Sequence, residues 1–117
     1  MIGQLLVGLI AVLHVYILVL EMFLWDKPAG LKAFANTPEK AQLTKVLAQN
    51  QGLYNGFLAA GLFWSLIAPE TYAVALANFF LGCVLIAGIY GGLTASKKII
   101  YIQSIPALIA LIAVNFF

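Results

Sequence analysis

The chain has 117 residues, of which 64% are hydrophobic and 9% are charged, and its mean hydropathy is +1.05. An average soluble domain is about 25% charged, so this composition excludes an ordinary soluble domain and predicts an integral membrane protein. The net charge of +2 is the difference between six lysines and four acids, and the lysines are too few and too scattered to form a nucleic-acid-binding surface. The single cysteine, Cys83, excludes an intramolecular disulfide and is interpreted as a small packing residue.

Apolar residues form four runs, at about residues 2–24, 47–68, 72–95 and 99–117. A helix crosses a bilayer with about 20 apolar residues, so each run is long enough to span. We therefore expect an all-α fold, an integral membrane four-helix bundle of antiparallel spans that forms a single transmembrane domain, 1–117. The first run has no basic n-region and no small-residue cleavage site, so it is expected to stay in the mature protein.

A polar connection, 25–46, follows the first run. Its motif DKPAG is expected to break the helix, because Pro28 lacks an N–H group. The stretch 37–40 then has the residue order of a helix start, with a capping threonine, a proline and an acid. One long helix is predicted from Pro38 to about Leu66, with its first two turns at the interface. Tight turns are predicted between the later runs.

The lysines predict the orientation. Four of them lie in the first connection, two in the third and none in the second. Cytoplasmic loops carry the excess of Lys and Arg, and the first and third connections of a four-span chain lie on one side. This side is therefore expected to be cytoplasmic, with both termini outside, in a multi-pass protein of the bacterial inner membrane. The lysines are Lys27, Lys32, Lys40, Lys45, Lys97 and Lys98.

Polar residues within the runs gather at the depth of the cytoplasmic leaflet. On a helix, His14, Glu21 and Trp25 fall on one stripe, and the second run begins with an amide-rich stretch, NQGLYN. Experiments on the insertion of helices into membranes give a cost of about 2.5–3.5 kcal/mol for a charged side chain at the centre of a span, so Glu21 needs a partner. We expect the amides to face the first span and to supply it. The candidate ligand-binding residues are His14, Glu21, Trp25, Asn50, Gln51, Tyr54 and Asn55.

The same residues also allow purely structural interpretations. Glu21 at the headgroup level would pair with Lys27 or Lys45, His14 would hydrogen-bond a neighbouring helix, and Trp25 would anchor the interface. The small-residue rows of the second and third runs, which include Gly52 and Gly56, are interpreted as packing devices. One His and one nearby Glu are too few for a closed zinc site, so no metal is expected, and no cofactor motif is present.

The stretches HVYILVLEMFLW and NQGLYNGFLAAGL resemble a family of short bacterial integral membrane proteins of unknown function with four predicted spans. The resemblance covers nearly the whole chain, implies the fold and brings no activity. A remoter likeness to emopamil-binding and sterol-isomerase proteins implies a membrane enzyme with His14 and Glu21 as the catalytic candidates. A likeness to small multidrug exporters implies competition between protons and cations for Glu21. Whether the protein is an enzyme stays open.

The expected function is binding of a hydrophobic or cationic amphiphilic molecule in a polar cavity of the cytoplasmic leaflet. Glu21 would recognise the polar or cationic end, and the amides of Asn50, Gln51 and Asn55 would orient it. The rings of Trp25 and Tyr54 would form the walls. The expected partners are the lipid bilayer and this ligand, with no nucleic acid; a homodimer is left open. The alternatives are an isomerase-like enzyme, a proton-coupled exporter and a structural membrane protein.

Overall fold

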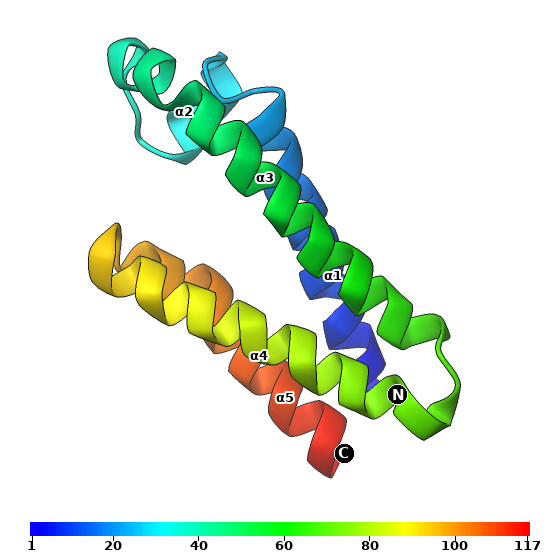
Figure 1. Ribbon diagram of the computed structural model, residues 1–117. Coiled ribbons are helices and arrows are strands. Elements are labelled where there is room, and N and C mark those ends of the chain that lie inside the picture. Colours follow the sequence, from blue (N-terminus) through cyan, green and yellow to red (C-terminus); the bar gives the residue numbers. More distant parts are fainter. The chain divides into compact units, whose positions relative to one another are not determined.

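The computed structural model describes residues 1–117 and contains helices but no strand, which confirms the all-α prediction. Two of the helices, α1 and α4, are long and apolar enough to cross a membrane by length and composition. In chain order the elements are α1 (Ile2–Met22), α2 (Pro28–Ala33), α3 (Pro38–Ile67), α4 (Glu70–Thr94), the π-helical turn η1 (Ile100–Ser104) and α5 (Ile105–Phe116) (Figure 1).

The predicted long helix is confirmed by α3, which runs for 30 residues from Pro38. Its start has the predicted chemistry, because the hydroxyl of Thr37 accepts a hydrogen bond from the backbone N–H of Lys40 at 3.3 Å. It ends at Ile67, and after Ala68 and Pro69 the next helix, α4, begins at Glu70. The tight turn predicted between the second and third runs is therefore confirmed.

The first connection contains a helix, α2, that the sequence analysis did not predict. Pro28 lies beyond the end of α1 at Met22 and occupies the start of α2, where its missing N–H costs nothing. Gly30 lets the α2 backbone lie against the chain that follows α1, since a Cβ at Gly30 would overlap the carbonyl of Leu24. The helix ends with Ala35 in a left-handed conformation, φ 50°, which lets Asn36 donate to the carbonyl of Leu31 at 2.9 Å.

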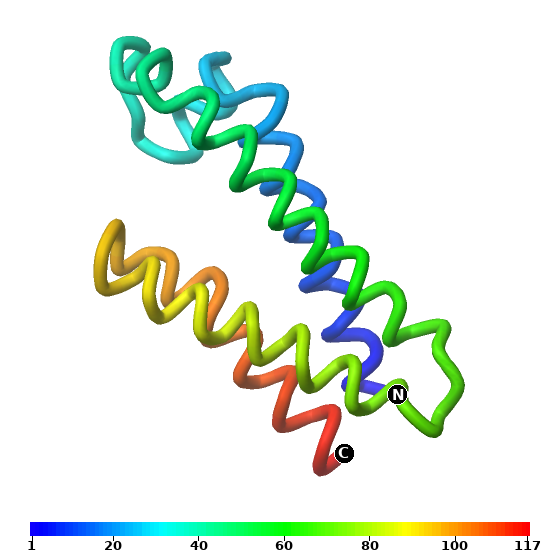
Figure 2. Tube along the Cα trace, viewed as in Figure 1, coloured from blue at the N-terminus to red at the C-terminus, as the bar shows by residue number.

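The chain divides into two compact units. The first comprises Met1–Ala11 and Leu58–Phe117, and the second comprises Val12–Phe57. The core of the first unit is built from buried aliphatic residues of α1, α3, α4 and α5, among them Val7, Leu62, Leu81, Val84, Ala107 and Ala110. In the same unit α4 and α5 run side by side (Figure 2).

Glycines bring α4 close to the chain that follows it. A Cβ at Gly88 would overlap the hydroxyl oxygen of Ser104 and lie 2.9 Å from the backbone nitrogen of Ser104. The side chain of Ser104 donates to the carbonyl of Leu85 at 3.2 Å. Close backbone approach at small residues is a common way for apolar helices to associate.

The π-helical turn precedes a proline. In an α-helix Pro106 would leave the carbonyl four residues earlier without a donor, and its ring would clash with that carbonyl. A wider turn is a recognised way of accommodating such a break. Here the backbone N–H of Ile105 donates to the carbonyl of Ile100, five residues earlier. We attribute η1 to this proline, which the sequence analysis did not consider.

Gly52 and Gly56 of α3 lie against α1 in the second unit. A Cβ at Gly52 would be 2.6 Å from Cγ of Met22 and 3.0 Å from Cβ of Glu21. A Cβ at Gly56 would be 2.7 Å from Cδ1 of Leu18. The missing side chains allow the two helices to approach closely at the level of Glu21, and this contact positions the candidate site.

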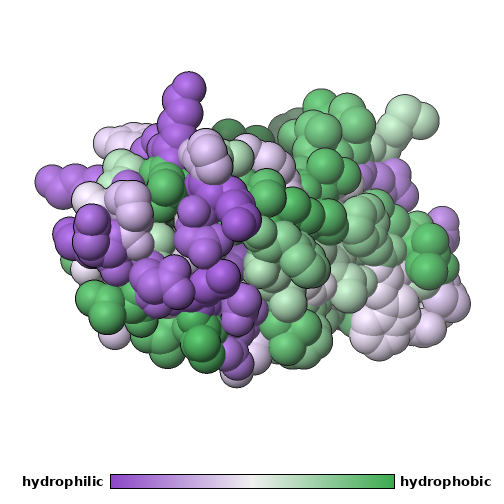
Figure 3. Space-filling view, turned by 90° about the horizontal axis from the view of Figure 1, so that it is seen from above, coloured by the Kyte–Doolittle hydropathy of each residue, from purple (hydrophilic) through white to green (hydrophobic).

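Large hydrophobic side chains cover much of the surface. In Figure 3 hydrophilic residues gather on one part of the face in view, and wide areas are hydrophobic. Exposed apolar surface of this extent is unusual for a soluble monomer and is compatible with contact to lipid. Examples distributed over α1, α3, α4 and α5 are Leu9, Tyr16, Leu47, Phe57, Phe79, Ile86, Ile109 and Phe116.

Candidate functional site

A buried carboxylate lies at the centre of the candidate site. Glu21, in the last turn of α1, is 1% exposed. One of its oxygens accepts a hydrogen bond from Nε2 of Gln51 at 2.8 Å, and the other accepts one from Nδ2 of Asn55 at 2.6 Å. Hydrogen bonds of this length are typical of amide donors to a charged acceptor. We call Glu21, Gln51 and Asn55 the carboxylate–amide cluster.

The spacing of the two amides explains why they converge. Residues four apart lie on the same face of a helix, one turn from each other. Gln51 and Asn55 therefore project from α3 toward α1, one to each carboxylate oxygen. Gly52, between them in sequence, lets the α3 backbone come close enough for both short amide side chains to reach the carboxylate.

The third predicted amide lies apart from the cluster. Asn50 is exposed and donates to the backbone carbonyl of Val46 on its own helix at 2.9 Å. The prediction that all three amides face the first span is thus confirmed for Gln51 and Asn55 and wrong for Asn50. The reason is helical geometry, since consecutive residues are 100° apart and Asn50 cannot share the face of the pair that follows it.

Lys45 is engaged elsewhere. Its ammonium group lies 3.0 Å from the carboxylate of Asp26, and this hydrogen bond lowers the pKa of Asp26 below its ordinary value. The alternative in which Lys45 neutralises Glu21 is therefore wrong for this structure. The buried carboxylate of Glu21 accepts its hydrogen bonds from two side-chain amides and not from a lysine.

The two residues predicted as aromatic walls have other partners. Trp25 packs against Phe34 with ring centroids 4.9 Å apart, and its indole N–H donates to the hydroxyl of Thr44 at 3.1 Å. Tyr54 is 57% exposed and contacts Phe57 on its own helix. Sequence reasoning missed Thr44 and Phe34, because their polar or aromatic character alone does not identify a partner across the connection.

His14 is fully buried on α1, two turns before Glu21. Seven residues of helix separate the two by roughly 10 Å along the axis. They share the buried side of α1, as the predicted stripe requires, but they do not form a hydrogen-bonded pair. The cluster thus joins three of the seven predicted site residues, Glu21, Gln51 and Asn55.

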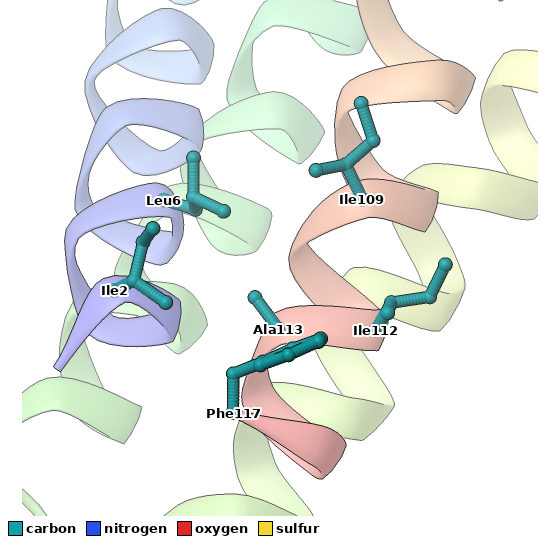
Figure 4. A pocket seen from close by; sticks show the side chains of 6 residues that line it. All are labelled: Ile2, Leu6, Ile109, Ile112, Ala113 and Phe117. Carbon is teal, nitrogen blue, oxygen red and sulfur yellow. The ribbon is translucent and has the colours of Figure 1, made fainter.

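Cavities are found in the first unit and are lined by other residues. One of about 320 Å³ is wholly apolar and lies between the beginning of α1 and the end of α5, where Leu6 faces Ile109 and Phe117 (Figure 4). Another of about 260 Å³ includes Gln4 and Ser65. Neither contains a predicted site residue, so a ligand head that contacts Glu21 must displace side chains that now cover it.

The chain is similar to known proteins along most of its length. The profile of a family described as Protein of unknown function (DUF1304) matches residues 8–115, a range that includes the whole cluster. A protein of Lactococcus lactis subsp. lactis (strain IL1403), described as Uncharacterized protein YpaA, is 32% identical over 107 residues, which make up 90% of this chain and 89% of that protein. No solved structure matches the chain.

Proposed function

The chain belongs to the family of proteins of unknown function DUF1304, and on that premise we propose from its own residues that it binds a hydrophobic or amphiphilic small molecule within the membrane. The polar or cationic end of the ligand contacts Glu21 in the cytoplasmic leaflet. The protein is a multi-pass protein of the bacterial inner membrane with four antiparallel spans and both termini outside.

The membrane arrangement is supported by length, composition and charge. Two helices are long and apolar enough to span, and the apolar parts of α3 and of the segment from Ile100 to Phe116 supply two more candidates. All six lysines lie in the first and third connections, which share a side in a four-span chain. Glu21 then lies toward the cytoplasmic end of α1.

The observation that carries the ligand proposal is the burial of the Glu21 carboxylate with two amide donors and no lysine. Ionisable groups within a span are expensive, and they commonly mark ligand or ion pathways. Two interhelical hydrogen bonds of about 0.6 kcal/mol each offset less than half of that cost. A cationic ligand that pairs with the carboxylate would compensate it more fully, and its apolar tail would lie among the lipids or against the exposed apolar surface.

Binding of amphiphiles with matched tails tests this proposal. Purified protein in an uncharged detergent is titrated with dodecyl compounds that carry a cationic, a neutral or an anionic head. We expect the wild-type protein to bind a cationic compound most tightly and Glu21→Gln to lose this preference. Glu70→Gln, an exposed acid at the start of α4, is the matched control and is expected to bind like the wild type. Equal binding of all three heads would refute the proposal.

A further inference from the structure

The carboxylate–amide cluster is rich in hydrogen-bond acceptors. Its two hydrogen bonds use the nitrogen of each amide and one acceptor position on each oxygen of Glu21. A carboxylate oxygen has two lone pairs and an amide oxygen accepts as well. The second lone pair of each Glu21 oxygen, Oε1 of Gln51 and Oδ1 of Asn55 therefore stay available as acceptors for a ligand that brings N–H donors.

The cluster lacks the surroundings that suit a quaternary ammonium head. Such a head has no N–H group and is recognised mainly by the faces of several aromatic rings. The nearby candidates are engaged elsewhere, since Trp25 packs on Phe34 and donates to Thr44, and Tyr54 contacts Phe57. A head without N–H donors would offer Glu21 its charge but no hydrogen bond.

The close contact of α1 and α3 also limits the size of the head. At Gly52 even one added carbon would lie 2.6 Å from the side chain of Met22 and 3.0 Å from Cβ of Glu21. Glu21 itself is 1% exposed, whereas Gln51 is exposed at the edge of the cluster. The exposed side of Gln51 is the edge from which a head group would reach Glu21. A primary ammonium group, about the size of a methyl group, needs less room at this edge than a trimethylammonium group.

We propose that the carboxylate–amide cluster selects a primary ammonium head group, whose three N–H donors are accepted by Glu21 and by the amide oxygens of Gln51 and Asn55. The ligand class is a long-chain primary amine in its charged form. This inference rests on the proposed function and adds the chemistry of the head group to it.

The test compares dodecylammonium with dodecyltrimethylammonium, which have the same tail and the same charge. Hydrogen bonds to charged groups contribute about 1.5–3 kcal/mol each, so even one such bond predicts binding of dodecylammonium about tenfold tighter or more. Titration calorimetry at neutral pH in an uncharged detergent measures both affinities. Empty detergent micelles, titrated in parallel, correct for partitioning of the amphiphiles.

Two variants identify the amides as the source of selectivity. Gln51→Leu and Asn55→Leu are each expected to reduce the preference for dodecylammonium by at least about threefold, because each removes one acceptor. Asn50→Leu is the matched control, since Asn50 bonds within its own helix, and it is expected to keep the wild-type preference. Gln51 is the exposed member of the pair, so its variant keeps the test valid if Asn55→Leu fails to fold.

The outcomes separate this inference from the function on which it rests. If both cations bind equally and Glu21→Gln abolishes both, Glu21 is a cation site and selection by N–H donors is refuted. If neither cation binds the wild-type protein, the proposed function itself fails. A preference for dodecylammonium that survives in both amide variants would refute the role assigned to Gln51 and Asn55.

Discussion

Glu21 depends on side chains from a different part of the chain. It is 30 residues from Gln51 and 34 from Asn55, yet it accepts a hydrogen bond from each. A buried acceptor that loses its donor costs more than the donor contributes when present, because the group has no water to replace it. The two amides therefore matter for the folded state as well as for any ligand.

Replacing one amide is expected to destabilise the protein. Asn55→Leu leaves one oxygen of Glu21 without its donor, and we expect a loss of about 1–3 kcal/mol in the free energy of unfolding. Thermal or denaturant unfolding in detergent measures it. Asn50→Leu should change stability by no more than about 0.5 kcal/mol, since the side chain of Asn50 is exposed. Equal effects of the two variants would contradict the assignment of Asn55 to the carboxylate.

Asp26 provides a prediction about pH. Its hydrogen bond with Lys45 lowers its pKa in the folded state, so the pair stabilises the fold above the ordinary pKa of an aspartate, about 3.9. This contribution is lost as the pH falls through the lowered pKa. Lys45→Met should therefore raise the pKa of Asp26 toward its ordinary value, as followed by NMR titration of the carboxyl carbon. An unchanged pKa would show that Lys45 does not pair with Asp26 in solution.

Helix packing is decided at single glycines, and α4 contains a matched pair of them. Gly88 faces Ser104, whose backbone nitrogen lies 2.9 Å from the position of an added Cβ, whereas an added Cβ at Gly82 meets nothing within 4 Å. The two positions share a helix, so alanine should have the same effect on helix propensity at both. Any difference between the variants then reports the contact of α4 with Ser104.

Gly88→Ala is expected to cost about 1–3 kcal/mol, because overpacking at a backbone contact forces the neighbouring segment to move. Gly82→Ala is expected to be neutral or to stabilise by up to about 1 kcal/mol, since alanine is the better helix former. The melting temperatures of both variants in detergent provide the measurement. A stable Gly88→Ala variant would show that η1 and α4 are not in close contact.

The distribution of lysines along the whole chain predicts its topology. After replacement of Cys83 by serine, single cysteines at Lys32→Cys and Lys97→Cys should be protected from a membrane-impermeant thiol reagent in intact cells. A cysteine added after Phe117 should be labelled. Labelling after lysis checks that each protein is present, and the reverse pattern in intact cells would invert the proposed orientation.

Much of the local structure was predictable because its causes are local. Helix α3 begins at a threonine, a proline and an acid that are adjacent in sequence, and the turn before α4 contains Pro69. Two contiguous motifs also indicated the family, and the match of the DUF1304 profile to residues 8–115 confirms the family. Helix α2 and η1 were not predicted because Pro28 was interpreted only as a helix break and Pro106 was not considered. In the structure Pro28 begins a helix and Pro106 follows a widened turn.

By itself the sequence determined the all-α class, the long α3 helix and the need of Glu21 for polar partners, because composition, capping residues and helical periodicity act over a few turns. Only the tertiary structure decided which partners it has. Where α1 and α3 approach at Gly52, Gln51 and Asn55 donate to Glu21 and Asn50 does not. Lys45 pairs with Asp26. Residue types state which hydrogen bonds could form, whereas helix rotation and backbone separation, which depend on contacts distant in sequence, select those that do.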